Sequence, residues 1–201
     1  MNDWFRQRCA RFGAAPALIG PWGVATYVEL AGLVEAARRS IDALGLSQPT
    51  SVAVLGGHGP AATAWLLALA EAGHFAVPLA GNPAEHPAKL AEVNVQWVVA
   101  TDGLTSRVLP RVAEAPRQPL LQALAQRGAA GLVLFSSGTT GRPKAMVQDF
   151  PAWLATFESR RPNRLPVLAL LGFDHVGGLN TLFGTLATGA ALVVPPDRSV
   201  A

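Results

Sequence analysis

Residues 51–79, SVAVLGGHGPAATAWLLALAEAGHFAVPL, decide the fold class. They contain an apolar strand over 51–55, a Gly/Pro turn, a helix over 61–72 and a second apolar strand over 75–79, with Gly73 ending the helix. Two strands joined by a helix pair in parallel through a right-handed crossover. Strands that are apolar throughout are typical of a sheet covered on both faces.

The same alternation continues on both sides of this unit. Towards the N-terminus, the sequence predicts a helix over 3–12, a hairpin around 17–25 and a long helix opened by the capping box Thr26–Glu29 and ended by Gly45. Towards the C-terminus, it predicts strands at 96–100, 131–135, 144–148, 167–171 and 190–194, and helices near 84–93, 119–127, 150–159 and 176–188. We therefore expect a layered α/β/α fold with a mostly parallel sheet, forming a single subdomain over 1–201.

Composition excludes several classes of protein. The chain has 201 residues, of which 50% are hydrophobic and 14% charged, and its formal net charge is +3. The only cysteine, Cys9, excludes a disulfide framework, and the scattered basic residues argue against nucleic acid as a partner. Residues 176–194 are long enough to cross a bilayer, but their glycines and Asn180 indicate a buried helix followed by a strand. No signal peptide is evident, and we expect a cytoplasmic protein with no membrane span.

The most informative motif follows the strand at 131–135. Residues 132–145 are LVLFSSGTTGRPKA, an apolar strand that enters a loop of small and hydroxyl side chains and then a lysine. Glycines allow the backbone to approach a ligand, hydroxyls and successive amides bind phosphate oxygens, and lysine adds a positive charge. The pattern matches neither the Walker A loop nor the dinucleotide fingerprint. The sequence predicts that ATP phosphates are bound by Ser136, Ser137, Gly138, Thr139, Thr140, Gly141 and Lys144.

This loop closely resembles the phosphate-binding loop of the adenylate-forming superfamily of acyl- and aryl-CoA synthetases, luciferases and peptide-synthetase adenylation domains. The resemblance extends to ATYVEL at 25–30, to the unit at 51–79 and to LLGFDHVGGL at 170–179. Ala145 departs from it, since relatives usually have glycine there. The resemblance implies an ATP-dependent ligase that uses Mg²⁺, forms an acyl-adenylate from a small carboxylic acid, and passes the acyl group to coenzyme A or a carrier protein.

The resemblance also implies a longer parent protein, because family members are about twice this length. We expect the chain to be the first subdomain, with the downstream subdomain and the C-terminal domain absent. No complete catalytic set, and no metal site, is expected within it. Alone it should be inactive, and its uncovered apolar face around 167–194 should favour self-association.

The resemblance places the acid-substrate pocket at Asp174, His175 and Gly178. Two alignments of this segment stay open. In the acyl-CoA synthetase alignment His175 borders the carboxylate and Asp174 supports it, whereas in the amino-acid-activating alignment Asp174 binds the substrate's amino group. A non-catalytic nucleotide- or anion-binding module is a further alternative, and His58 is interpreted mainly as part of a tight turn.

Overall fold

The larger of two β-sheets has a parallel centre and antiparallel edges. In the structure, a computed structural model that describes residues 4–46, 49–109, 119–136 and 144–196, its strand order is β6-β5-β3-β4-β7-β8. The four inner strands run parallel, while β6 and β8 are antiparallel to their neighbours. The strands are β3 (Ser51–Leu55), β4 (Phe75–Leu79), β5 (Trp97–Asp102), β6 (Thr105–Leu109), β7 (Gly131–Ser136) and β8 (Lys144–Asp149).

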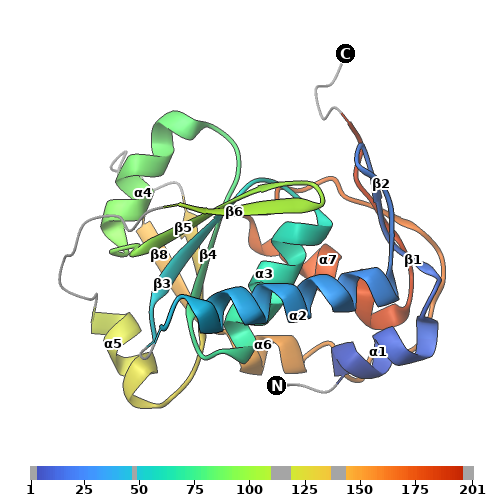
Figure 1. The fold of residues 1–201 in the computed structure, drawn as a ribbon, viewed down its shortest axis with the longest axis horizontal. Helices are drawn as coiled ribbons and strands as arrows, with labels where there is room; N and C mark the ends of the chain where they lie inside the picture. The colour runs from blue at the N-terminus through green and yellow to red at the C-terminus, as the bar shows by residue number, and fades with distance from the viewer. Residues whose placement is uncertain (1–3, 47–48, 110–118, 137–143, 197–201) are drawn as a thin grey trace.

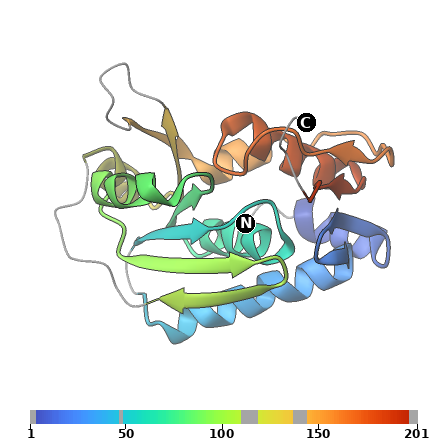
Figure 2. The ribbon, with the colours of Figure 1, turned by 90° about the horizontal axis from the view of Figure 1, so that it is seen from above.

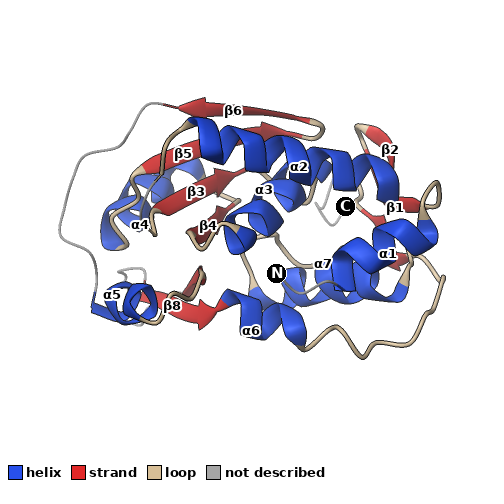
Figure 3. Cartoon of the chain, turned by 60° about the horizontal axis from the view of Figure 1, so that its bottom comes forward, coloured by secondary structure: helices blue, strands red, loops and turns tan. Residues whose placement is uncertain are grey.

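Helices cover both faces of this sheet (Figures 1 and 3). Val52 and Val54 share a core cluster with α3 (Pro60–Glu71) and α2 (Tyr27–Ala43), whereas Ala53 points into a second cluster with α5 (Pro119–Gln126). Leu90 of α4 (His86–Glu92), which follows a 3₁₀ turn at Pro83–Glu85, packs against that second cluster. Alternate side chains of one strand are thus buried on opposite faces, as a covered sheet requires.

A smaller sheet joins the two ends of the chain, and its strand order is β2-β1-β10-β9. Its strands are β1 (Pro16–Gly20), β2 (Gly23–Thr26), β9 (Val167–Leu168) and β10 (Leu192–Val193). Three helices accompany it, α1 (Trp4–Phe12), α6 (Phe150–Ala155) and α7 (Val176–Thr188). In Figure 2, β9, β10 and the N-terminal hairpin lie at the same end of the molecule.

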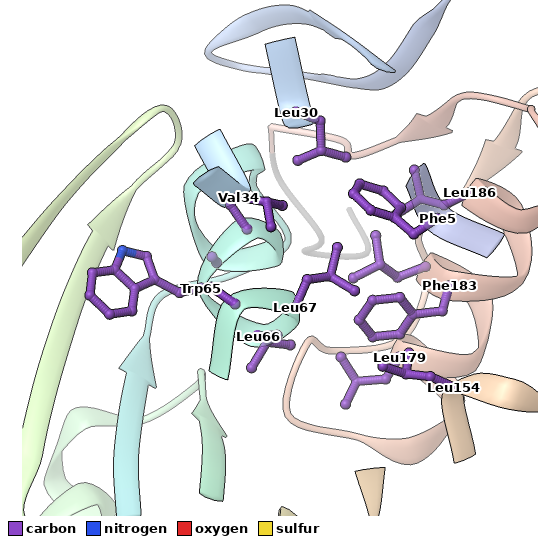
Figure 4. Close-up of a cluster of buried hydrophobic side chains, with 14 of the residues drawn as sticks. Phe5, Leu30, Val34, Trp65, Leu66, Leu67, Leu154, Leu179, Phe183 and Leu186 are labelled. Atoms are coloured by element: carbon purple, nitrogen blue, oxygen red, sulfur yellow. The ribbon is translucent and has the colours of Figure 1, made fainter. Parts of the chain in front are cut away.

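Helix α3 is the centre of the main core (Figure 4). Its ten residues from Pro60 to Leu69 are all buried. Leu67 points towards Phe183 of α7 and Phe5 of α1, while Trp65 points the other way, towards the larger sheet. The helix is therefore hydrophobic around its whole circumference, as expected of one enclosed between a sheet and other helices.

The layered α/β class and the parallel centre are confirmed. The limits of β3, β4 and α7 agree with the sequence prediction, and the capping box forms, with the Thr26 amide donating to Glu29 Oε2 at 2.8 Å. Helix α7 ends at Gly189, whose φ of +79° favours glycine. In the described part of the chain no helix is long and apolar enough to cross a membrane.

Two features differ from the sequence prediction: an additional strand in the larger sheet, and a second sheet where one was expected. Strand β6 was not predicted, because TSRVL mixes polar and apolar residues at an exposed edge. Strands β9 and β10 are not part of the larger sheet: β10 pairs with β1 of the N-terminal hairpin, where Leu18 lies opposite Leu192, and β9 pairs with β10. This pairing joins segments far apart in sequence, which local patterning does not encode.

Candidate active site

The candidate site lies where the parallel strands of the larger sheet end. Strands β3, β4 and β7 run in the same direction, so Leu55, Leu79 and Ser136 end at one edge of the sheet. The loops that follow β3 and β7 both begin there. In open α/β sheets, ligands bind outside the carboxyl ends of the strands.

The two ends of the predicted phosphate loop are held together by a hairpin. Ser136, the last residue of β7, lies opposite Lys144, the first residue of antiparallel β8. Ser136 is half-buried and Lys144 is exposed. The other predicted loop residues, Ser137, Gly138, Thr139, Thr140 and Gly141, lie outside the described residues. The hairpin thus presents a seven-residue connection, 137–143, whose ends are fixed by strand pairing.

The only other lysine has structural partners. Lys89 Nζ lies 2.9 Å from Glu85 Oε2, one helical turn earlier in the chain, and 6.0 Å from the ring centre of Phe135 on β7. The Lys89–Glu85 pair lowers the pKa of the Glu85 carboxyl below its ordinary value. Lys89 is therefore a useful comparison for Lys144, because Lys89 is a cation near β7 that is already engaged in an ion pair.

The second group of predicted residues forms the entrance to α7. His175 is the N-cap residue of that helix, and its side chain is 66% exposed, whereas that of Asp174 is 17% exposed. The His175 Nε2 atom lies 3.9 Å from Asp174 Oδ1. Both side chains fold over Gly172, where an added Cβ would lie 2.8 Å from Asp174 Oδ1 and 3.0 Å from His175 Cδ2. Histidine is thus the more accessible of the two groups.

Gly178 has a packing role in this entrance. It is buried in the first turn of α7, and a Cβ there would collide with the carbonyl oxygen of Gly172. The absence of a side chain lets the loop lie directly on the helix. Its place at the border of the substrate pocket stays a prediction.

His58 joins this loop to the larger sheet. It follows β3 and is 2% exposed, and its Nε2 lies 3.0 Å from the carbonyl oxygen of Leu171. Because a carbonyl only accepts hydrogen bonds, Nε2 carries the proton and donates it. The ring also makes an edge-to-face contact with Phe173, at 5.7 Å between centres. Sequence reasoning did not find this role, since the partners are 113 residues apart.

Other features of the molecule are separate from these residues. A groove of about 390 Å³ is lined by Arg160, Asn163 and the Thr181–Thr185 side of α7, and contains none of the predicted site residues.

Burial raises the pKa of the Cys9 thiol to about 12, which keeps it protonated at neutral pH. Among described residues no three His, Cys, Asp or Glu side chains gather as a metal site.

Comparison with known proteins defines the class of protein to which this fold and site belong. The family model of AMP-binding enzymes matches residues 82–201, which include the Ser/Thr/Gly loop and the α7 entrance. The chain belongs to this family, the adenylate-forming superfamily, as its sequence motifs predicted.

Two curated relatives match nearly the whole chain. It is 29% identical to indoleacetate–CoA ligase of Aromatoleum aromaticum, over 98% of this chain and 45% of that protein. It is 30% identical to phenyloxazoline synthase MbtB of a Mycobacterium species, over 96% of this chain and 18% of that protein. The chain thus spans less than half the length of these relatives, one of which is a CoA ligase.

Solved structures share the fold. The N-terminal subdomain of Klebsiella oxytoca NpsA, in complex with 3-hydroxybenzoyl-AMSN, superposes with a TM-score of 0.76 at 22% identity, over 99% of this chain and 54% of that one. The N-terminal domain of FACL13 from Mycobacterium tuberculosis gives a TM-score of 0.73 at 20% identity, over 98% and 57%. These matches establish that the chain shares the fold of these two N-terminal parts.

Proposed function

We propose that this chain is the N-terminal part of an ATP-dependent ligase of the acyl-CoA synthetase type. In the first step a carboxylate oxygen attacks the α-phosphorus of ATP, the bond from that phosphorus to the bridging oxygen breaks, and pyrophosphate leaves. In the second step the thiol of coenzyme A or of a carrier arm attacks the acyl carbon and releases AMP. The curated CoA-ligase relative supports this direction.

The observation that supports the proposal most is the β7–β8 hairpin. Its strands fix Ser136 and Lys144 side by side at the ends of a connection rich in hydroxyls and glycines. Such a connection supplies several donors and one cation to the β- and γ-phosphates, which positions the α-phosphorus and offsets developing charge.

The loop's role is tested in the full-length protein that contains this chain. Lys144→Ala and Thr139→Val should each reduce ATP–pyrophosphate exchange by roughly 10- to 150-fold, since a hydrogen bond to a charged group contributes about 1.5–3 kcal/mol. Thermal stability should change little. Lys89→Ala is the matched control, because it removes the other lysine and should leave exchange within about twofold. Full exchange activity in Lys144→Ala would remove the loop from the mechanism.

The acid substrate is proposed to meet His175. Its exposed ring at the start of α7, with Asp174 folded behind it, favours the acyl-CoA synthetase alignment. His175→Ala should then raise the KM for the carboxylic acid by about tenfold, the effect of losing one hydrogen bond, while the KM for ATP stays within about twofold.

An amino-acid-activating domain is the second candidate, because Asp174 supplies a carboxylate at the same entrance. Pyrophosphate exchange measured with matched pairs of amino acids and their deaminated acids decides between the acyl-CoA synthetase and the amino-acid-activating assignments. If Asp174→Ala abolishes the preference for an α-amino group, the acyl-CoA synthetase assignment is wrong. If the full-length protein binds phosphate yet exchanges with no acid, the chain belongs to a non-catalytic anion-binding protein.

The chain of 201 residues is proposed to be inactive by itself and to associate with further copies. It spans 45% of the CoA-ligase relative, so more than half of that protein has no counterpart here. Purified chain should give no pyrophosphate exchange. Measurable acyl-adenylate formation would contradict this.

A further inference from the structure

His58 is held rigidly at the edge of the larger sheet. The turn that contains it, residues 56–59, is anchored at both ends, by the amide of Gly56 donating to Leu79 O at 3.0 Å and by the amide of Thr63 donating to Gly59 O at 2.9 Å. The next residue, Pro60, is the first of buried helix α3. The imidazole therefore projects from a turn that backbone hydrogen bonds fix next to a buried helix.

The loop that His58 contacts is hydrogen-bonded to the start of α7. The amide of His175 donates to Gly172 O at 3.2 Å, and the amide of Leu179 donates to His175 O at 3.0 Å. Gly178 lies directly against the Gly172 carbonyl, so the loop and the first helical turn are in close contact. A displacement at Leu171 is consequently transmitted to the backbone that presents Asp174 and His175.

His58 makes a direct contact between these two parts. Its Nε2–H donates to Leu171 O at 3.0 Å, and its ring lies edge-to-face with Phe173, which is fully buried. A buried hydrogen bond fixes both distance and direction, while an apolar contact alone permits sliding. This side chain thereby helps to fix the position of the loop relative to the carboxyl end of β3.

We infer that His58 is a positioning residue for the acid half of the site. By holding Leu171 and Phe173, it sets where His175 stands relative to the carboxyl end of β3. The inference rests on the proposed function, because it assigns the acid substrate to the α7 entrance. It predicts that His58 acts on acid binding and leaves ATP binding unchanged.

The test uses two polar replacements that differ by one methylene group. His58→Gln places an amide nitrogen near the former Nε2 position and keeps the donor to Leu171 O, whereas the shorter His58→Asn does not reach it. His74→Gln is the control. His74 is another buried histidine, 4% exposed, whose Nδ1 accepts from the Thr50 amide at 3.2 Å, at the opposite end of β3.

The first measurement is amide hydrogen exchange of the 201-residue chain. His58→Asn should speed exchange of the amides from Gly172 to Leu179 by about tenfold, the effect of losing one buried hydrogen bond. His58→Gln should restore the rate to within about twofold, and His74→Gln should leave it unchanged. Equal rates in the wild type and His58→Asn, or the same increase in His74→Gln, would overturn the inference.

The second measurement is steady-state pyrophosphate exchange in the full-length protein. His58→Asn should raise the KM for the acid by about tenfold with the KM for ATP within twofold, and His58→Gln should reverse this. Equal rises in both KM values would assign His58 a general stabilising role and overturn the inference. If the wild type exchanges with no acid, the proposed function fails, while hydrogen exchange still tests the contact between His58 and the loop.

Discussion

Glu71 shows how a single residue can make folding depend on pH. It ends α3 with a side chain only 6% exposed, beside a small cavity lined by Trp4, Phe5 and Leu154. One carboxylate oxygen lies 3.5 Å from Arg6 Nη2, and the other has no hydrogen-bond partner among the described residues. Burial raises the pKa of this carboxyl, and the nearby Arg6 lowers it only in part.

The direction of the effect follows from linkage. A carboxyl whose pKa is raised by folding binds protons more tightly in the folded state, so its contribution is full below the unfolded pKa and is lost as pH rises through the folded one. The substitution Glu71→Gln removes the ionisable group, and with it the loss of folding stability at high pH. The variant should be more stable than the wild type at pH 7, and the difference should disappear towards about pH 4, the ordinary range of a glutamate.

Urea unfolding across this pH range provides the measurement. Glu35→Gln is the control, because Glu35 binds the same Arg6 at 3.0 Å but is 52% exposed. Glu35→Gln should change the free energy of unfolding by no more than about 1 kcal/mol, and this change should not grow as the pH rises from 4 to 7. A Glu71→Gln variant less stable than the wild type at pH 7 would mean that the contact with Arg6 outweighs the burial cost.

At the scale of elements, one arginine of helix α1 binds three backbone carbonyls of other segments. Arg8 donates from Nε to Ala187 O at 2.6 Å, and from Nη2 to Arg160 O at 3.1 Å and Glu158 O at 3.3 Å. Arg11 and Arg164 both lie over the ring of Phe12. Basic residues that are scattered in sequence thus converge where α1 meets the end of α7 and the segment after α6.

Arg8→Lys keeps the charge but replaces a planar fork by a point donor, which cannot hold the same carbonyls at once. We expect a loss of about 1–3 kcal/mol in the free energy of unfolding, with the first increase in hydrogen exchange in α1. Arg39→Lys, at an exposed position of α2, should change stability by less than about 0.5 kcal/mol. Equal stability of Arg8→Lys and wild type would show that apolar contacts alone hold α1.

Local signals predicted most elements because the signals are themselves local. Gly73, Gly189 and the Thr26–Glu29 box act within one helical turn, so the helix ends they define agree with the structure. Pairing between distant segments has no such signal. The second sheet and the contact between His58 and Leu171, 113 residues apart, therefore emerge only in the fold. The Ser/Thr/Gly loop is predicted from its chemistry to bind phosphate, which stays a prediction, and the hairpin shows how its ends are held.

At the scale of the whole molecule, an apolar region between residues 165 and 176 lies uncovered in the part of the chain that the structure describes. Exposed side chains gather between residues 165 and 176, where Leu165 is 70%, Leu168 50% and Leu170 73% accessible. In the described part of the chain β9 is also an edge strand of the smaller sheet, with β10 on one side. From Leu179 onward, in contrast, helix α7 buries its large apolar side chains, so the uncovered region does not extend to residue 194 as the sequence prediction of 167–194 did. An apolar surface next to an open strand edge favours association with another chain.

We therefore expect the 201-residue chain to self-associate through β9 and the segment after it. Sedimentation velocity should give a weight-average mass that rises above 20.9 kDa as the concentration increases. A double variant, Leu168→Lys with Leu170→Lys, places charges on the edge strand and beside it, and should keep the chain monomeric because two ammonium groups would have to be desolvated in the contact. Leu120→Lys, at a 62% exposed position on α5, is the matched control and should associate like the wild type. A wild-type chain that stays monomeric at the highest concentration would show that this region is too small to drive association. Association retained in the double variant would place the contact elsewhere on the molecule.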